Sequence, residues 1–297
     1  MFKGSIVALV TPFKNGEIDE DKLRELVEWH IENKTDAILP CGTTGESPTL
    51  SYEEHNRVIK IVVEQAKGRV PVIGGTGSNS TRETLELSEH AKSVGCEAIL
   101  LVVPYYNKPS QNGLYEHYKV VAEKISLPII VYNIPGRTGV NLEPSTFVKI
   151  CKSCKNIVGI KEAAGSIEQV SQLYLGLMEL GLEEKVSILS GDDSMTYPMM
   201  TLGAKGVISV VANIVPQKVY QLTKFALENN FLEAKKLHYE LYNLMKAMFV
   251  ETNPVPVKAA MELMKLCSGE VRLPLTRMLK QNEEKLVQVL KQYGLVK

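Results

Sequence analysis

The chain has 297 residues, enough for one large α/β barrel or for two ordinary domains. Hydrophobic residues make up 44 % of it, and 34 basic side chains balance 34 acidic ones. This neutral balance gives no indication of a nucleic-acid partner or of binding to an acidic membrane surface. No apolar run approaches the roughly 20 residues of a membrane-spanning helix, and the first residues lack the pattern of a signal peptide. We therefore expect a cytoplasmic protein.

Short segments rich in Val and Ile alternate with amphipathic segments along most of the chain. Eight of the apolar segments are predicted strands, at residues 5–10, 37–41, 70–74, 98–103, 128–133, 157–161, 186–190 and 206–211. Continuously apolar strands are typical of parallel strands that are covered on both faces. Between them, apolar residues recur at helical spacing. The clearest helices are predicted at 19–33, 51–66, 81–94 and 111–124.

This alternation predicts an α/β fold, a (β/α)8 TIM barrel. A doubly wound sheet is the alternative, but it usually carries a Gly-x-Gly-x-x-Gly motif after its first strand. The nearest match, Gly-Gly-Thr-Gly at 74–77, follows the third strand instead. After about Ala226 the strand pattern stops, and helices are predicted at 231–249, 256–267 and 276–293. We therefore predict a barrel over residues 1–226 and a C-terminal helical domain over residues 227–297.

The cysteines and histidines give little indication of a metal site. Cys151 and Cys154 form a Cys-x-x-Cys pair, a spacing that redox and zinc sites use. No second pair and no His-x-x-x-His motif follows, whereas structural zinc usually has four ligands. We favour a reduced pair at a helix end. The five histidines, at 30, 55, 90, 117 and 238, lie in helical segments without ligand spacing. We predict no metal.

The sixth predicted strand ends at Lys161. In a barrel of this kind, functional side chains gather at the carboxyl ends of the strands. Burial at the end of an apolar strand disfavours the ammonium form and lowers the lysine pKa. The neutral amine that results is the form that attacks a carbonyl group. A lysine that pairs with Glu162 or reaches solvent is the alternative, and position alone favours that alternative.

The fifth predicted strand carries Tyr132 near its end and Arg137 in the loop that follows. The adjacent strand would place Tyr132 near Lys161, where its phenol could transfer protons. A core tyrosine with a satisfied hydroxyl is the alternative. Arg137 follows a Pro-Gly turn, so its guanidinium would be held on a stiff loop suited to bidentate binding of a carboxylate. A surface ion pair is the commoner role of a single arginine.

Two more strand ends carry polar loops. The sequence Gly-Thr-Thr-Gly-Glu-Ser at 42–47 follows the second strand. Its glycines allow close backbone approach, and its amides with the hydroxyls of Thr43 and Thr44 would form a small site for a carboxylate. An ordinary turn with a helix cap is the alternative. Tyr105 and Tyr106 follow the fourth strand, and paired tyrosines on a loop are often interface residues.

Together these segments resemble the dihydrodipicolinate synthase and N-acetylneuraminate lyase family. The most specific sequences are those at 42–47, 132–139 and 159–162, which stand in order at three predicted strand ends. The likeness runs from residue 2 to residue 213 and continues more loosely into the C-terminal helices. Within this family, the segment at 135–139 resembles the synthases, which carry an arginine at the position of Arg137. The sialic-acid lyases lack that arginine. The resemblance implies the roles described next.

By this resemblance, Lys161 forms a Schiff base with pyruvate, and Thr44 with neighbouring amides binds the pyruvate carboxylate. Arg137 receives the carboxylate of L-aspartate 4-semialdehyde. The imine acts as an electron sink, the resulting enamine adds to the aldehyde, and ring closure gives 4-hydroxy-tetrahydrodipicolinate, at the branch point of diaminopimelate and lysine biosynthesis. No external cofactor is needed, because the lysine is itself the electrophilic catalyst.

The resemblance also implies a proton relay and an assembly. Tyr132, Thr43 and Tyr106 form the relay, with Tyr106 supplied across a dimer interface. Gly191 and the carbonyl of Ile208 line the pocket. The family is usually a homotetramer built as a dimer of dimers.

Lysine, the end product, is an effector in part of this family and binds at a subunit interface. The positions that match the effector site carry Ser47, His55, Asn79, Glu83 and Tyr105. Glu83 could pair with the effector's ammonium, and Asn79 could hydrogen-bond its carboxylate. Pro48 and Tyr52 depart from the pattern of the more sensitive relatives. Polar residues that only fill a wet interface are the alternative.

Two other functions compete with this interpretation. A related aldolase that cleaves 2-keto-3-deoxy sugar acids would keep Lys161 and Tyr132 but would need no arginine at 137. A non-catalytic small-molecule sensor on the same scaffold would be expected to lose the lysine or the tyrosine, and this chain has both.

Overall fold

A computed structural model describes residues 2–297 of the chain. Eight parallel strands form one sheet in the order β4–β1–β10–β9–β8–β7–β6–β5. Their bounds are β1 Gly4–Ala8, β4 Ala37–Leu39, β5 Ile73–Gly75, β6 Ala98–Val102, β7 Ile129–Asn133, β8 Ile157–Glu162, β9 Ser187–Ser190 and β10 Gly206–Ser209. Strands β2 (Phe13–Lys14) and β3 (Glu17–Ile18) form a separate antiparallel hairpin.

The sheet closes on itself between β4 and β5. Ile38 forms an isolated parallel bridge with Val72, and the amide of Gly75 donates to the carbonyl of Pro40 at 3.1 Å. A Cβ added to Gly75 would lie 2.5 Å from the carbonyl oxygen of Cys41, so glycine is what allows this close approach. The predicted TIM barrel is therefore confirmed, as a nearly closed barrel of eight parallel strands.

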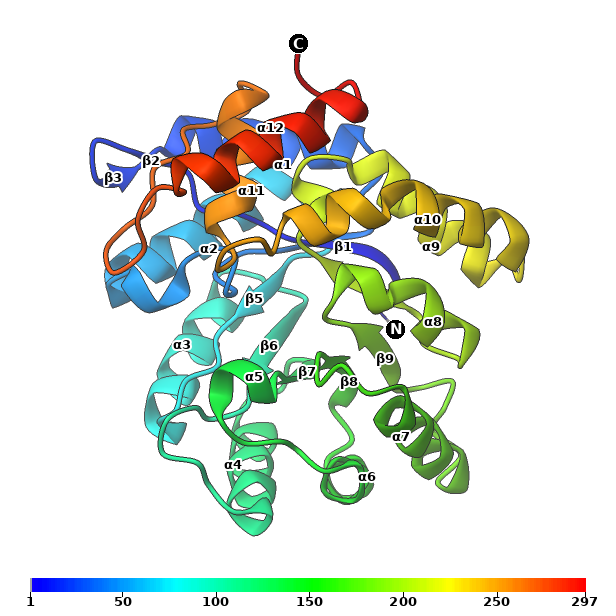
Figure 1. The fold of residues 1–297 in the computed structure, drawn as a ribbon. Helices are drawn as coiled ribbons and strands as arrows, with labels where there is room; N and C mark the ends of the chain where they lie inside the picture. Colours follow the sequence, from blue (N-terminus) through cyan, green and yellow to red (C-terminus); the bar gives the residue numbers. More distant parts are fainter. Residues whose placement is uncertain (1) are drawn as a thin grey trace.

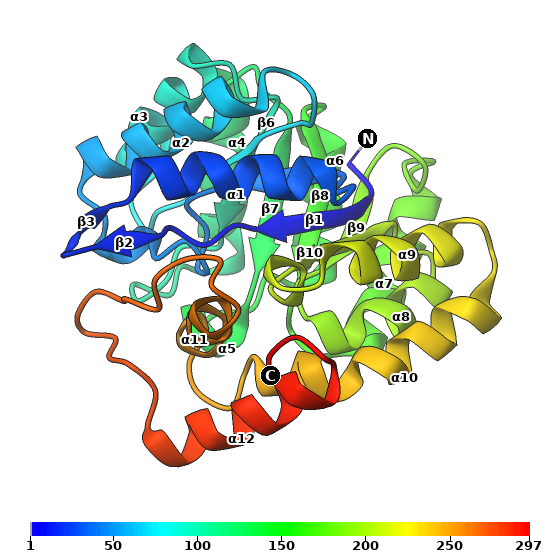
Figure 2. The same ribbon diagram turned by 90° about the horizontal axis from the view of Figure 1, so that it is seen from above.

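A helix follows each barrel strand and covers the outside of the sheet (Figures 1 and 2). These helices are α1 (Glu20–Glu32), α2 (Tyr52–Ala66), α3 (Thr81–Ser93), α4 (Gln111–Lys124), α6 (Pro144–Ser153), α7 (Ile167–Glu179), α8 (Thr196–Thr201) and α9 (Pro216–Leu227). The short helix α5 (Pro135–Thr138) lies between β7 and α6. Single 3₁₀ turns span Ser47–Thr49, Asp193–Met195 and Val211–Asn213.

Both faces of the sheet are buried. The barrel interior is filled by Ile6, Ala8, Ala37, Leu39, Ile73, Ala98, Leu100, Ile130, Tyr132, Leu189 and Ile208. Alternate residues of the same strands, such as Val7, Ile99 and Val131, pack outward against the helices in a larger core. This two-sided burial explains the continuously apolar strands of the sequence. It also brings Tyr132, at the carboxyl end of β7, into the barrel interior.

The C-terminal segment after α9 is helical, as predicted. It contains α10 (Phe231–Ala247), α11 (Val255–Leu263) and α12 (Lys280–Gln292). Figures 1 and 2 show these helices, yellow to red, gathered on one side of the barrel, where α10 packs on α9 and α12 packs on α10 and α11. The division at residues 226 and 227 stays a prediction, and α9 ends at Leu227. Within residues 2–297, no helix is long and apolar enough to cross a membrane.

Predicted and observed elements differ mainly at their ends. The strand predicted at 206–211 ends at Ser209, because Val210 and Val211 turn into a 3₁₀ helix and donate their amides to a buried carboxylate. The helix predicted at 51–66 begins after Ser51, which caps it in a capping box with Glu54. The β2–β3 hairpin and α5 are too short to produce a periodic pattern, and the sequence did not indicate them.

Candidate active site

Lys161 and Tyr132 lie side by side at the carboxyl ends of β8 and β7. The two residues are register partners in the parallel ladder. The lysine Nζ lies 4.1 Å from the centre of the tyrosine ring. Both side chains are buried, and Lys161 is only 5 % exposed. The structure therefore places Lys161 and Tyr132 next to each other, as the sequence predicted.

Burial determines the charge state of Lys161. The pKa of Lys161 is lowered from 10.5 to about 7, chiefly by desolvation and to a smaller extent by the nearby Arg137 guanidinium. The carboxylate of Asp193 acts in the opposite direction, because a negative charge stabilises the ammonium form. A large fraction of the amine is consequently neutral near pH 7. This is the form that a nucleophilic lysine requires.

Tyr132 remains protonated over the same range. Desolvation raises the pKa of its phenol to about 12, partly offset by Arg137 and by a side-chain hydrogen bond with Thr43. A neutral phenol in contact with a hydroxyl can both donate and accept a proton. Thr43, on the loop that follows β4, and Tyr132, near the end of β7, therefore form a hydroxyl pair next to the lysine.

Glu162, the sequence neighbour of Lys161, does not pair with it. Successive residues of a strand point to opposite faces. The Glu162 carboxylate accepts hydrogen bonds from Asn133 Nδ2 at 3.1 Å, Gln169 Nε2 at 3.0 Å and the amide of Ala164 at 2.6 Å. The alternative in which Glu162 neutralises the lysine is thus absent from the structure.

The loop at 42–46 and the loop after β7 meet at one residue from the C-terminal segment. Asn253 Nδ2 donates to the hydroxyl of Thr44 at 3.0 Å, and the main-chain carbonyl of Asn253 accepts from the Arg137 guanidinium at 3.1 Å. Thr44 is buried, as is Asn253. Two predicted substrate-binding residues are therefore joined through a residue, Asn253, that the sequence did not single out.

Asp193 is a second residue that the sequence analysis missed. Its carboxylate is buried and accepts from Ser209 Oγ at 2.5 Å and from the amides of Val210 and Val211 at 3.0 and 2.9 Å. Desolvation nevertheless raises its pKa to about 6. The signal that could have found it is Asp-Asp at 192–193, one residue beyond the end of β9.

Two further predicted pocket residues are Gly191, directly after the end of β9, and Ile208 on β10. A Cβ added to Gly191 would lie 3.2 Å from the Cε of Lys161, so the absence of a side chain there leaves space for the lysine. Ile208 lies on β10 and contributes to the apolar barrel interior. Gly191 therefore borders Lys161, and Ile208 lies in the same interior core as Tyr132.

A cavity of about 360 Å³ opens over these loops. Its wall includes Thr43, Tyr132 and Arg137. The same wall includes Ser47, His55, Glu83 and Tyr105 from the predicted effector set, together with Pro48 and Tyr52. The cavity wall thus contains four of the five predicted effector residues and three of the eight predicted catalytic and substrate-binding residues, and Lys161 and Thr44 are not part of it.

The predicted effector residues differ in what they offer to a ligand. The Glu83 carboxylate accepts from Ser78 Oγ at 2.6 Å. His55 donates from Nε2 to the carbonyl of Gly75 at 2.8 Å, and desolvation lowers its pKa, so it is neutral at pH 7. Asn79 is not part of the cavity wall, and its carbonyl accepts from Asn107 at 2.9 Å.

Tyr106 stands apart from the other predicted catalytic residues. It is 88 % exposed, with φ at 71°, a left-handed conformation that non-glycine residues rarely adopt. Within one copy of the chain, its phenol therefore points to solvent rather than toward Thr43 and Tyr132.

The remaining candidate groups give no metal site. Residues 2–297 contain no group of three or more His, Cys, Asp or Glu side chains that could hold a metal ion. All five cysteines are free and buried, and Cys151 and Cys154 lie at the end of α6. Desolvation raises the pKa of both thiols, which keeps them protonated and unreactive.

A family model described as the dihydrodipicolinate synthetase family matches residues 1–293. The chain belongs to this family. It is 58 % identical over 296 residues to the 4-hydroxy-tetrahydrodipicolinate synthase of Geotalea uraniireducens, with all of both chains covered. The prediction of a lyase with this synthase activity is confirmed by such full-length relatives.

Two solved structures in the family carry informative ligands. A chloride-inhibited dihydrodipicolinate synthase from Acinetobacter baumannii, complexed with pyruvate, is 47 % identical with a TM-score of 0.95 and full coverage of both chains. The enzyme from Cyanidioschyzon merolae, with lysine bound, is 38 % identical with a TM-score of 0.95, and 99 % of each chain is covered.

The lowered pKa of Lys161 leads to a prediction about its reactivity. Trace acetylation, read by peptide mass, should increase with pH and reach half its maximum near pH 7. Asp193→Asn removes the negative charge that stabilises the ammonium, so the midpoint should move below 7. Glu162→Gln is the matched control and should leave the midpoint in place. A wild-type midpoint near 10.5 would show that the amine is solvated.

Proposed function

We propose that the chain condenses pyruvate with L-aspartate 4-semialdehyde through a Schiff base on Lys161. The observation that carries the proposal is the desolvated amine beside Tyr132 at the carboxyl end of the barrel. The named activity of the relatives and the pyruvate complex of one of them support the choice of substrates. The product is 4-hydroxy-tetrahydrodipicolinate.

The first half of the reaction forms and activates the imine. The neutral Lys161 amine attacks the ketone carbon of pyruvate, and water leaves as the carbon–nitrogen double bond forms. Thr44 and the neighbouring amides hold the pyruvate carboxylate. The protonated imine withdraws electrons, so the methyl group loses a proton and an enamine results. Tyr132 and Thr43 move the protons that these steps consume and release.

The second half forms the carbon–carbon bond and the ring. The enamine carbon attacks the aldehyde, whose oxygen takes up a proton to become a hydroxyl. Arg137 holds the α-carboxylate of the semialdehyde during this step. The amine of the same substrate then attacks the imine carbon, closes the six-membered ring and expels Lys161. The lysine supplies the electron sink itself, so the reaction needs no external cofactor.

Tyr106 completes the proton relay from a second copy of the chain. Its exposure and its left-handed backbone support this role, because the phenol projects away from its own barrel. A homotetramer, a dimer of dimers, provides such a partner. The five free cysteines fit a reducing compartment, and we place the enzyme in the cytoplasm.

Lysine regulates the enzyme from the part of the cavity lined by Ser47, His55, Glu83 and Tyr105, with Asn79 nearby. The lysine-bound relative supports this proposal. The Glu83 carboxylate offers a partner for an ammonium group at the cavity wall.

The proposed Schiff base is tested by trapping. Borohydride added with pyruvate should label Lys161 alone, and the mass of the labelled peptide identifies the site. Lys161→Met should abolish both the label and synthase activity, whereas Lys218→Met, at a surface lysine paired with Glu240, keeps Lys161 available for labelling. A label on another lysine, or turnover of N-acetylneuraminate in place of the semialdehyde, would contradict the assignment.

The role of Arg137 is tested by its effect on one substrate. Arg137→Ala removes a charged hydrogen-bond donor, and such contacts contribute roughly 1.5–3 kcal/mol. The KM for the aldehyde should therefore rise about ten- to a hundredfold, while imine formation with pyruvate persists. Steady-state kinetics at varied aldehyde concentration provide the measurement. An unchanged aldehyde KM would remove Arg137 from the binding site.

Regulation is tested by titrating lysine at sub-saturating pyruvate. Millimolar lysine should inhibit the wild type, and Glu83→Ala should need about tenfold more, since a charged partner for the ammonium is lost. Glu86→Ala, one turn along α3 and paired with Arg82 at the surface, is the control and should behave as wild type. Equal inhibition of all three proteins would place the effector elsewhere.

A further inference from the structure

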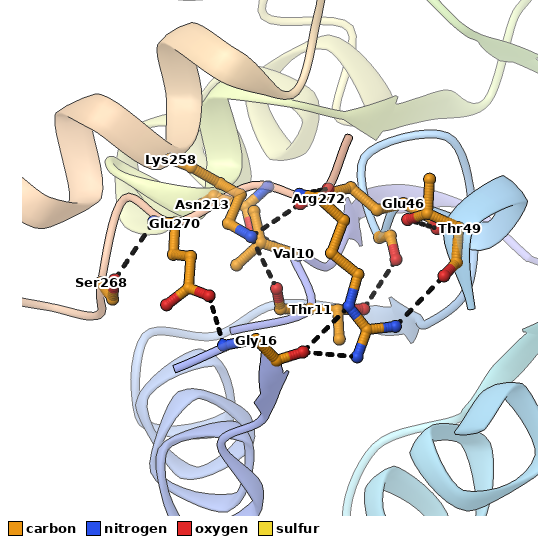
Figure 3. A network of polar contacts seen from close by, with 11 residues as sticks. Val10, Thr11, Gly16, Glu46, Thr49, Asn213, Lys258, Ser268, Glu270 and Arg272 are labelled. Atoms are coloured by element: carbon orange, nitrogen blue, oxygen red, sulfur yellow. Dashed lines mark hydrogen bonds and ion pairs between the residues drawn. The ribbon is translucent and has the colours of Figure 1, made fainter. Parts of the chain in front are cut away.

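A buried ion pair joins the C-terminal segment to the loop that carries Thr43 and Thr44. Lys258 of α11 and Glu46 have no exposed side-chain surface, and Lys258 Nζ lies 2.6 Å from Glu46 Oε1. The same ammonium donates to the carbonyl of Thr11 at 2.9 Å and lies 4.2 Å from the centre of the Phe13 ring. Figure 3 shows Lys258, Glu46 and Thr11 converging from three separate segments.

The second oxygen of Glu46 is held by the same part of the chain. Glu46 Oε2 accepts the amide of Arg272 at 3.0 Å, and the Arg272 guanidinium binds the carbonyls of Gly16 and Thr49 (Figure 3). Glu46 itself adopts φ 54°, a left-handed conformation that costs energy for a residue with a side chain. The surrounding donors therefore hold this residue in a conformation that it would not favour alone.

Main-chain hydrogen bonds within a single turn connect Glu46 to the two threonines. The amide of Glu46 donates to the carbonyl of Thr43 at 3.1 Å, and the amide of Gly45 donates to Gly42 at 3.1 Å. On the other side, Thr11 Oγ1 donates to the carbonyl of Gly45 at 2.7 Å. Displacement of the Glu46 side chain would consequently displace the turn that presents both threonine hydroxyls.

Asn253 acts on Thr44 directly. It is 4 % exposed, and its Nδ2 donates to Thr44 Oγ1 at 3.0 Å. A hydroxyl that accepts such a bond keeps its own proton available for donation. The proton of Thr44 is therefore free to bind an anion, which is the task proposed for this residue.

We infer that Lys258 and Asn253 are positioning residues for pyruvate: Lys258 fixes the turn at 42–46 through Glu46, and Asn253 orients the Thr44 hydroxyl toward the carboxylate. The inference rests on the proposed binding of pyruvate by Thr44. Stability alone does not require the ion pair, since replacing a buried pair by apolar residues of similar volume is often neutral or stabilising.

The experiment measures trapped imine against pyruvate concentration in four proteins. They are the wild type, Asn253→Ala, the double variant Glu46→Gln/Lys258→Met, and Arg277→Gln. The double variant leaves no unpaired buried charge. Arg277→Gln is the control, because it breaks an ion pair with Glu262 within the same C-terminal segment and away from the loop. Thermal unfolding of each protein is recorded in parallel.

We expect half-saturation by pyruvate to rise about tenfold in Asn253→Ala and at least as much in the double variant, since one neutral hydrogen bond contributes roughly that factor. The pH midpoint of imine formation should stay near 7, because neither change alters the charges that shift the Lys161 pKa. A purely structural role would instead lower the melting temperature and the amount of imine, with half-saturation unchanged.

Half-saturation within twofold of the Arg277→Gln control, in variants that fold, would overturn the inference. If the double variant does not fold, Asn253→Ala decides alone, since it removes one side-chain amide and keeps the main-chain carbonyl that binds Arg137. A different result would contradict the proposed function itself: wild-type Lys161 would then form no adduct with pyruvate, before any variant is compared.

Discussion

Desolvation of one amine is the constraint on which the rest of the site depends. A shift of the Lys161 pKa from 10.5 to about 7 corresponds to about 5 kcal/mol of interaction that disfavours the ammonium. Burial in an apolar environment is the main cause of this shift. The barrel provides it, because β7, β8 and β9 surround the side chain and the interior below it is packed with aliphatic residues. Barrel closure is thus a chemical requirement of the site as well as a structural one.

The acidic groups near Lys161 are arranged so that the pKa of the lysine stays low. Glu162 is adjacent in sequence, yet the alternation of the strand turns it outward, where it accepts hydrogen bonds from Asn133, Gln169 and Ala164. Asp193 is the carboxylate whose charge acts on Lys161. Two amides and a hydroxyl hold it in place by hydrogen bonds. Its negative charge limits how far the pKa of Lys161 falls, and burial keeps a fraction of the amine neutral.

Local sequence was sufficient to predict the parts of this arrangement that depend on periodicity. Tyr132 and Lys161 end neighbouring parallel strands, so their contact follows from strand order once a barrel is assumed. Asn253 gave no such signal, because its contact with Thr44 spans 209 positions along the chain. Lys258 is a single lysine in an apolar helix, and its partner is 212 positions away. Contacts of this kind depend on how the C-terminal helices dock, which periodicity does not encode.

The C-terminal segment holds in place the loops of both proposed carboxylate-binding sites. The barrel strands alone supply the lysine, the phenol and the apolar walls. The loop that would receive the substrate carboxylate, however, is held by Lys258 and by the amide of Arg272, and Arg137 is held by the carbonyl of Asn253. The two proposed carboxylate-binding sites therefore both depend on contacts with the C-terminal segment. A change in the docking of α11 would alter both sites together, whereas the Lys161 amine would stay buried inside the barrel.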